Sequence, residues 1–378
     1  MEKIKLQEVI GQFKTKKVLV VGDFYLDEYI TGQTEKFSPE APVPRVIIKE
    51  RTFTPGCAGN VTMNLASLGA QVTTLGVIGQ DNYGKIMLEQ FQAKGINTQP
   101  MLQKQKRLTG TFSRLLLQGQ GTTKQHMVRM DNENQFSITE QTAEELMQQL
   151  TKNIPQHDII FVADYDEADG KGIIRPRILQ HITNLAKQYN KFTVGISREN
   201  IKDFEHIDLV VCNELEAEQT TGKKIRNQEE FLQTGEELRK LLNNKITIIS
   251  KGKEGMYVFE QNNQHHTPSF AKNVVDVCGA GDTLTSTFTL AINSNTHSKE
   301  AAELASHAAA ISIAKPGTAT ATPKELLVAA EQENKKSVGP TVYTKIKTVA
   351  ELKAVMEQFH QENKTTIFTN GYFDGLHT

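Results

Sequence analysis

The chain has 378 residues, 43 of them basic and 44 acidic, so its formal net charge at pH 7 is -1. This balance excludes a global attraction to nucleic acid or to an anionic membrane, so any bound phosphate must be held by a local site. The N-terminus lacks the apolar core of a signal peptide, and no stretch is long enough to span a membrane. Cys57, Cys212 and Cys278 form no CxxC pair. We therefore expect a cytoplasmic protein with reduced thiols and no nucleic-acid or membrane partner.

The first strong strand is KKVLVVGDF (16–24), a β-branched run whose carboxyl end opens into a loop at Gly22 and Asp23. In parallel sheets, ligands bind at that end of the strands. The next segment, EKFSPEAPVPRVIIKERTF (35–53), contains three prolines between two extended stretches. Prolines disfavour a central strand, so residues 37–53 are predicted to form a small β lid.

From residue 61 to about residue 314, apolar strand patterns alternate with helical patterns. Strands are predicted at 71–79, 110–118, 126–131, 158–165, 191–197, 207–213 and 245–252, with a hairpin at 255–270. Helices are predicted at 61–70, 83–95, 138–154, 176–190, 228–244 and, in two pieces, 282–314. This alternation predicts an α/β fold with a mostly parallel sheet.

The composition changes near Ala329, which divides the chain into a first domain, 1–330, and a polar linker, 331–346, interrupted by Gly339 and Pro340. Residues 347–378 then begin a second α/β unit. Its helix is TVAELKAVMEQFHQENK, with Thr348 and Glu351 at capping-box spacing, and the strand TTIFTN follows it.

The most informative motif is NVVDVCGAGDTLTSTFTLAI, in which Gly279, Ala280 and Gly281 precede Asp282 and a helix. Glycines at a helix start let backbone N–H groups approach an anion, and the helix dipole adds to the attraction. An aspartate there lies near enough to a bound phosphate to take a proton from an attacking hydroxyl. An ordinary Asp cap after a glycine turn explains the motif about equally well.

Three weaker clusters accompany this motif, and each has a simpler explanation. Gly56, Gly59 and Asn60 suit a polyol site, or merely a helix start. Asn213 and Glu216 offer oxygen ligands for Mg²⁺ through water, or simply an acidic surface helix. Gly252 and Gly255 suit a nucleotide lying against the backbone, or a plain hairpin.

The four clusters follow one another along the chain as GCAGN, NELE, KGKEG and DVCGAGDT. This order resembles that of the ribokinase-type (PfkB) carbohydrate kinases, and the resemblance covers roughly residues 10–328. The resemblance implies a three-layer α/β/α fold, ATP and Mg²⁺ as cofactors, and Asp282 as the general base. It makes Gly279, Ala280 and Gly281 an anion hole for the transferred phosphoryl group. It also implies an ATP site of Asn213, Glu216, Lys251, Gly252, Gly255 and Gly317, with Mg²⁺ at Asn213 and Glu216 through water, and a sugar site of Asp23, Asp27, Gly56, Asn60, Arg114 and Arg129. For each arginine, a surface position on a strand remains the alternative.

A narrower resemblance comes from three further segments, VGDFYLDEYITG, FSPEAPVPRV and AKPGTATATPKEL. They resemble the kinases of D-glycero-β-D-manno-heptose 7-phosphate that also carry a nucleotidyltransferase domain. That domain opens with GxFDxxHxGH. Here GYFDGLHT supplies Gly371, Phe373, Asp374 and His377 and stops, so no adenylyltransferase activity is expected.

Several positions depart from the heptose kinase pattern. Cys57 replaces a glycine, Phe112 stands in place of a lysine, and His307 stands in place of an asparagine. GISREN replaces a DPK sequence, which leaves Arg198 as the nearest cation, and after Tyr165 only Lys171 remains to replace a further lysine. Each lost contact between a cation and a phosphate costs about 1.5 to 3 kcal/mol. These losses predict either a weakened heptose phosphate kinase or a relative adapted to another sugar.

The leading expectation is O1 phosphorylation of the heptose 7-phosphate to the 1,7-bisphosphate, in the synthesis of ADP-heptose for the lipopolysaccharide core. The alternatives are a kinase for another small sugar, nucleoside or sugar phosphate, and a catalytically idle binding protein. The lid is expected to pair two subunits as a homodimer, because its strands would otherwise be exposed edges.

Overall fold

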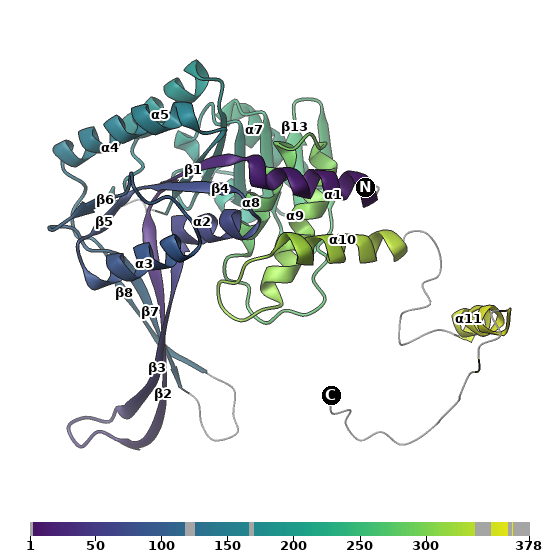
Figure 1. The fold of residues 1–378 in the computed structure, drawn as a ribbon, viewed down its shortest axis with the longest axis horizontal. Helices are drawn as coiled ribbons and strands as arrows, with labels where there is room; N and C mark the ends of the chain where they lie inside the picture. The colour runs from purple at the N-terminus through teal and green to yellow at the C-terminus, as the bar shows by residue number, and fades with distance from the viewer. Residues whose placement is uncertain (1–2, 118–124, 166–169, 337–348, 362–364, 366–378) are drawn as a thin grey trace. The chain divides into compact units, whose positions relative to one another are not determined.

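An eight-stranded sheet forms the centre of the first of two units, Met1–Leu327 and Val328–Thr378, into which the chain divides (Figure 1). The computed structural model describes residues 3–117, 125–165, 170–336, 349–361 and 365. The strand order is β14-β13-β12-β11-β10-β9-β1-β4. Neighbours from β4 to β12 pair in parallel, and β13 and β14 are antiparallel. The strands are β1 (Lys17–Gly22), β4 (Gln71–Leu75), β9 (Ile159–Asp164), β10 (Phe192–Ser197), β11 (Leu209–Asn213), β12 (Ile246–Ser250), β13 (Met256–Glu260) and β14 (Asn263–Thr267). The predicted mostly parallel sheet is confirmed.

Helices cover both faces of this sheet, because its strands are apolar on both sides. On β1, Leu19 and Val21 belong to the core shared with α4, α5 and α7, whereas the alternate Val18 and Val20 are equally buried outside it. Helix α8 packs against α2 and α9, both of which contact the sheet, and Lys5 of α1 binds Glu300 of α9 at 2.7 Å. The helices are α1 (Lys3–Gln12), α2 (Ala58–Ser67), α3 (Asn82–Ala93), α4 (Glu140–Asn153), α5 (Pro176–Gln188), α6 (Glu214–Thr221), α7 (Gln228–Leu242), α8 (Ala280–Ile292) and α9 (Ser298–Ile313). The result is the expected three-layer α/β/α arrangement.

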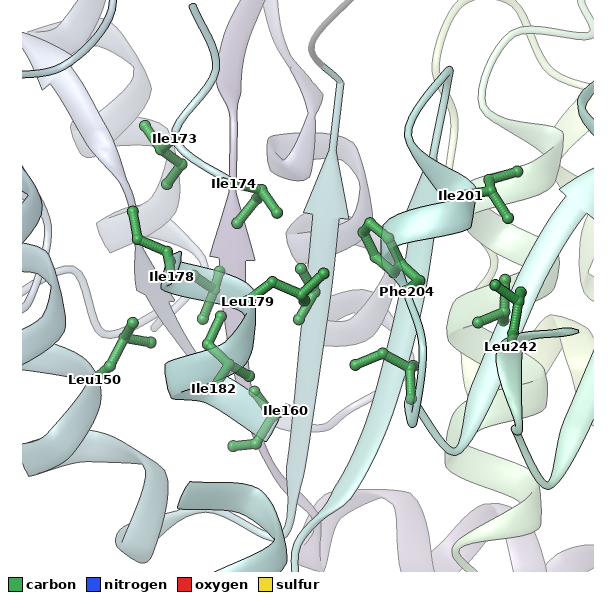
Figure 2. Close-up of a cluster of buried hydrophobic side chains, with 14 of the residues drawn as sticks. Leu150, Ile160, Ile173, Ile174, Ile178, Leu179, Ile182, Ile201, Phe204 and Leu242 are labelled. Atoms are coloured by element: carbon green, nitrogen blue, oxygen red, sulfur yellow. The ribbon is translucent and has the colours of Figure 1, made fainter. Parts of the chain in front are cut away.

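The core between the sheet and helices α4, α5 and α7 consists of branched aliphatic side chains and a few phenylalanines. Figure 2 shows Ile160 of β9 beside Ile178 and Ile182 of α5, with Phe204 and Leu242 further along the same layer. All five have 1% or less of their surface exposed. This packing fixes the carboxyl ends of β9, β10 and β11, from which several site residues extend.

A second sheet, β3-β2-β7-β8, extends from the three-layer body (Figure 1). Its strands are β2 (Phe24–Phe37), β3 (Pro44–Cys57), β7 (Gly110–Leu117) and β8 (Gln125–Asn132). The predicted lid, 37–53, is therefore only part of the lid sheet, which includes 24–57 and two later strands. The prolines that suggested a flap lie near the β2–β3 turn, while the pairing of β2 with β3 continues toward the body through two register shifts. A small parallel pair, β5 (Val77–Gly79) and β6 (Leu102–Lys104), lies outside both sheets.

Helix α10 (Pro323–Lys336) begins with a capping box, in which Thr322 and Glu325 exchange hydrogen bonds of 2.9 and 3.3 Å. The predicted linker start is wrong, because residues 331–336 are helical. Good helix formers in KELLVAAEQENKK outweigh its polar composition. In the second unit, the predicted helix is α11 (Val349–Gln361). Thr348, most of TTIFTN, and Gly371, Phe373, Asp374 and His377 lie outside the described residues. Within the described ranges, no helix is long and apolar enough to cross a membrane.

Two adjacent leucines of α7 test this packing. Leu242 is fully buried, whereas Leu241 has 55% of its surface exposed. We predict that Leu242→Ala lowers the free energy of unfolding by about 2–5 kcal/mol, through lost burial and a residual cavity. Leu241→Ala should change it by less than about 0.5 kcal/mol. Urea denaturation of both variants measures the difference, and equal losses would contradict the core assignment.

Candidate active site

A cavity of about 390 Å³ lies where the carboxyl ends of β9, β10 and β11 meet the lid sheet and the start of α8. This is the edge at which parallel sheets bind ligands. The predicted residues that line the cavity are Asp27, Asn60, Arg114, Arg129, Asn213, Glu216, Gly279, Ala280, Gly281 and Asp282. The predicted residues that do not line it are Asp23, Gly56, Lys251, Gly252, Gly255 and Gly317. The fold thus gathers residues more than 250 positions apart, Asp27 and Asp282, into one chamber.

Asp282 lies in the first turn of α8 and accepts two hydrogen bonds from distant segments. Asn60 Nδ2 donates to Oδ2 at 2.7 Å, and the hydroxyl of Tyr165 donates to Oδ1 at 2.5 Å. Burial raises the pKa of Asp282 above its usual value, while these two hydrogen bonds and the charge of Arg198 act in the opposite direction. The carboxylate is thereby fixed at the cavity wall with a raised proton affinity.

The turn before α8 requires glycine at position 279. Gly279 has φ of +75°, and a Cβ atom there would lie 2.4 Å from Nδ2 of Asn60. The Ala280 N–H already donates to the Val277 carbonyl at 3.3 Å. The N–H groups of Gly281 and Asp282 belong to the first helical turn, which has no intrahelical acceptor for them. A Cβ on Gly281 would meet no atom within 4 Å, so the space beside that amide is open.

Asp276 organises the loop that leads to this turn. Its carboxylate accepts hydrogen bonds from the N–H groups of Cys278, at 2.9 Å, and Gly317, at 3.2 Å. Gly317 therefore supports the loop from outside the cavity wall. Its φ of +70° is one that glycine adopts without strain.

The lid side of the cavity carries two arginines that are already partnered. Arg114 Nη1 contacts Asp27 Oδ1 at 2.6 Å, and both side chains are largely buried. Arg129 binds Asp131 at 2.7 Å, and its guanidinium lies 4.3 Å from the ring centroid of Phe112. The lid thus presents charge that is partly neutralised.

Two predicted sugar-site residues act from behind the wall. Gly56 leaves room for the carboxylate of Asp27, which a Cβ at that position would approach to 2.6 Å. Asp23 is buried and accepts hydrogen bonds from the N–H groups of Tyr165 and Ile173 at 3.3 and 2.9 Å. Burial and the nearby charge of Asp164 raise the pKa of Asp23 to about 7. Asp23 thereby holds the backbone of Tyr165 in place.

On the opposite side, Asn213 and Glu216 form the capping box of α6. Asn213 Oδ1 accepts from the Glu216 N–H, and Glu216 Oε2 accepts from the Asn213 N–H, both at 2.8 Å. Burial raises the pKa of Glu216. Both residues therefore have a structural role at the start of α6, and both also line the cavity.

The predicted strand-turn residues after β12 lie outside the cavity lining. Lys251 binds Glu254 at 3.1 Å, and its ammonium lies 5.0 Å from the ring centroid of Phe231. Gly252 and Gly255 have φ of +51° and +99°, which suits the tight turn into β13. Strands β12 and β13 pair antiparallel on either side of this turn, and the contact of Gly252 and Gly255 with a nucleotide stays a prediction.

The donor set at Asn213 and Glu216 fits Mg²⁺ only through water. The capping box uses one carboxylate oxygen of Glu216 and leaves Oε1 for a ligand water. In the described part of the chain, no group of three or more His, Cys, Asp or Glu side chains is placed to hold a metal ion. Such a site matches the preference of Mg²⁺ for few protein ligands, several waters and substrate phosphates.

Sequence reasoning did not select Tyr165 as a site residue, and it noted Arg198 only as a substitution. Both directly follow strands, β9 and β10, at the carboxyl edge of the sheet, and this position was the available signal. Cys57 has φ of +53°, a conformation that glycine adopts more readily, and burial raises the pKa of its thiol. Cys57, Cys212 and Cys278 all line the cavity.

The other departures from the family pattern have identifiable surroundings. Phe112 stacks on Tyr25 with ring centroids 4.8 Å apart. His307 is buried and stacks on Phe270 at 4.1 Å. The backbone carbonyl of Lys171 accepts a hydrogen bond from Arg107. Residues 166–169 lie outside the described ranges.

Comparison with known proteins identifies the class. Residues 15–325 match the model of the pfkB family carbohydrate kinases. Among solved structures, Arabidopsis thaliana ribokinase in complex with ribose and ATP is similar, with a TM-score of 0.65, 19% identity, and coverage of 83% of this chain and 98% of that one. Escherichia coli phosphofructokinase-2 in complex with substrates and products is also similar, with a TM-score of 0.66 and 16% identity. The match covers 84% of this chain and 98% of that one. The chain belongs to the pfkB family and is a sugar kinase with a ribokinase-like fold.

Curated relatives are more specific. The bifunctional protein HldE of Trichlorobacter lovleyi is 32% identical over 379 aligned residues, which cover 100% of this chain and 74% of that protein. The bifunctional protein HldE of Desulfatibacillum aliphaticivorans is 33% identical, with coverage of 97% and 73%.

Tyr165→Phe tests the hydrogen bond to Asp282, under the hypothesis that Asp282 is the base. Loss of a donor to the carboxylate raises the pKa of Asp282 further, so the acid limb of kcat against pH should move to higher pH. The shift should be on the order of one pH unit, because such a bond contributes about 1.5–3 kcal/mol and one unit equals about 1.4 kcal/mol. Tyr189→Phe, at an exposed position, is the control. An unmoved acid limb in Tyr165→Phe would disprove the coupling.

Proposed function

We propose that this sugar kinase uses ATP to phosphorylate D-glycero-β-D-manno-heptose 7-phosphate at O1, giving the 1,7-bisphosphate for ADP-heptose and lipopolysaccharide core synthesis. The observation that carries the proposal is the position of Asp282. Its carboxylate shares one cavity with the arginines of the lid and with the Asn213–Glu216 pair. The similarity to bifunctional HldE proteins and the SPEAPVPRV segment favour the heptose substrate. In this proposal residues 1–330 form the kinase domain and residues 347–378 begin a second unit.

In the proposed reaction, Asp282 takes the proton of the sugar hydroxyl as that oxygen attacks the γ-phosphorus of ATP. Asn60 and Tyr165 hold the carboxylate, so it meets the hydroxyl without reorganisation. Its raised pKa increases its affinity for the transferred proton. The amides at the start of α8 would stabilise the charge that develops on the phosphoryl group.

ATP and Mg²⁺ complete the proposed site. Bound Mg²⁺ would neutralise charge on the phosphate oxygens of ATP. Asn213 and Glu216 would orient its ligand waters from the start of α6. Support for ATP comes from the ribokinase complex, and support for Mg²⁺ from the oxygen donors of this pair.

The 7-phosphate of the sugar would lie near Arg114 and Arg129. A guanidinium that already binds one carboxylate still has N–H groups for a phosphate. Both side chains line the cavity from neighbouring positions of the β7–β8 pair, where Arg114 is directly opposite Arg129.

One observation favours a different sugar. Phe112 stands where heptose kinases carry lysine, and its ring lies between Tyr25 and Arg129. An apolar face next to partly neutralised arginines suits a sugar with less charge. The second candidate is therefore a kinase for another small sugar or sugar phosphate.

A coupled assay distinguishes these candidates. We expect turnover of heptose 7-phosphate with a kcat/KM at least tenfold above that of the unphosphorylated heptose and of fructose 6-phosphate. A preference for an unphosphorylated sugar would refute the heptose 7-phosphate kinase and support a kinase for another small sugar.

Asp282→Asn tests the proposed base. Its amide keeps the shape of the side chain but accepts no proton, so kcat should fall by about 10²–10⁴-fold. Titration calorimetry should show ATP affinity within a few-fold of wild type. Asp203→Asn, at an exposed position, controls for a general effect of charge. Full activity of Asp282→Asn would refute the role.

We also propose that the lid pairs two subunits. Edge strand β8 is exposed along its length and carries Met127, Val128 and Met130, each with about half of its surface exposed. An unpaired apolar edge favours association with another strand. Light scattering should give the mass of a dimer for the wild type and of a monomer for Val128→Asp, while Leu241→Asp stays dimeric. A monomeric wild type would refute the pairing.

A further inference from the structure

Arg198 differs from the other cations of the cavity because no carboxylate of the described residues forms an ion pair with it. Arg114 binds Asp27, and Arg129 binds Asp131. Of the lining residues, which all fall within the described ranges, Arg198 is the one cation outside an ion pair. Its side chain is exposed, and its guanidinium carbon lies 5.6 Å from the ring centroid of Tyr165. A cation held by an aromatic face keeps its N–H groups available to an anion.

The register of the sheet places Arg198 between the two halves of the cavity. Ser197 pairs with Asp164 of β9, and Ile196 pairs with Val211 of β11. Continuing these registers, by one residue beside β9 and by two beside β11, places Arg198 level with Tyr165 on one side and with Asn213 on the other. Tyr165 contacts Asp282, whereas Asn213 caps α6.

Electrostatics agree with this central position. The charge of Arg198 lowers the pKa of Asp282 and also that of Glu216, although burial raises both. The charge of Asp27, across the cavity, raises the pKa of Asp282. The guanidinium of Arg198 therefore lowers the pKa of a carboxyl group on each side of the cavity, Asp282 at the start of α8 and Glu216 on α6.

We infer that Arg198 is a catalytic residue that binds the phosphoryl group during its transfer from the nucleotide to the sugar. The phosphoryl group crosses from the α6 side to Asp282, and negative charge is spread over its three equatorial oxygens. A guanidinium between the two sides contacts these oxygens with two N–H groups, and this contact is stronger in the transition state than in either ground state. This inference rests on the proposed role of Asp282.

The test compares Arg198→Ala with Lys202→Ala, which removes an exposed cation from the same loop outside the cavity. The sugar used is whichever one the wild type turns over fastest, so a failed heptose assignment does not affect the result. Arg198→Ala should lower kcat by about 10²–10³-fold, the range for loss of one charge-stabilising donor. KM for the sugar should change less than threefold, millimolar guanidinium should restore part of the rate, and Lys202→Ala should behave as wild type.

A binding measurement gives a second readout that does not depend on turnover. Aluminium fluoride imitates the transferred phosphoryl group, so titration calorimetry with ADP, Mg²⁺ and aluminium fluoride should show tighter binding than ADP alone in wild type. Arg198→Ala should bind ADP normally and lose this gain. A raised KM with unchanged kcat would instead make Arg198 a substrate clamp. That result, an unchanged rate, or an undiminished gain from aluminium fluoride would overturn the inference.

Discussion

The hydrogen bonds from Asn60 and Tyr165 to Asp282 are the contacts on which the rest of the site depends. They join the start of α2, the end of β9 and the start of α8 at a single carboxylate. Such an arrangement needs a rigid support, and the support is the parallel sheet with helices on both faces. Since β9 lies between β1 and β10 in the sheet, Tyr165 cannot shift without disturbing the core under the cavity.

The hydrogen bonds to Asp282 also restrict which residues can occupy the neighbouring positions. Gly279 must be a glycine because of its φ and because a side chain would collide with Asn60. Asp23 has no place in the cavity, yet it holds the backbone of Tyr165 through a buried hydrogen bond. Residues behind the wall are therefore as restricted as those that face the ligand, although for reasons of geometry rather than chemistry.

Much of the fold could be predicted from the sequence, because its signals are local. Runs such as VLVVG and LVVCN have the length and branching of buried parallel strands, and the helices between them carry regular apolar faces. The lid was underestimated because its strands alternate irregularly and because β2 pairs with β7, a segment 85 residues further along the chain. The predicted linker starts at residue 331, inside α10, because this helix has a polar composition although its residues have good helix propensity.

The site was predictable only where a residue has a distinctive local context. Asp282 follows a glycine turn and Asn213 ends a strand, and both line the cavity. Tyr165 and Arg198 have no motif, and their importance comes from contacts made across the sheet. By contrast, Lys251 and Gly317 belong to the turns around the site rather than to its wall, which spacing alone could not reveal.

The central claim is that one chamber brings a sugar hydroxyl to Asp282 opposite a nucleotide. A crystal structure with ADP, aluminium fluoride, Mg²⁺ and the preferred sugar tests it most directly. The account predicts the accepting hydroxyl within about 3 Å of the Asp282 carboxylate, with the fluoride group between that hydroxyl and ADP. A sugar bound with every hydroxyl away from Asp282, or a nucleotide bound outside this cavity, would contradict it.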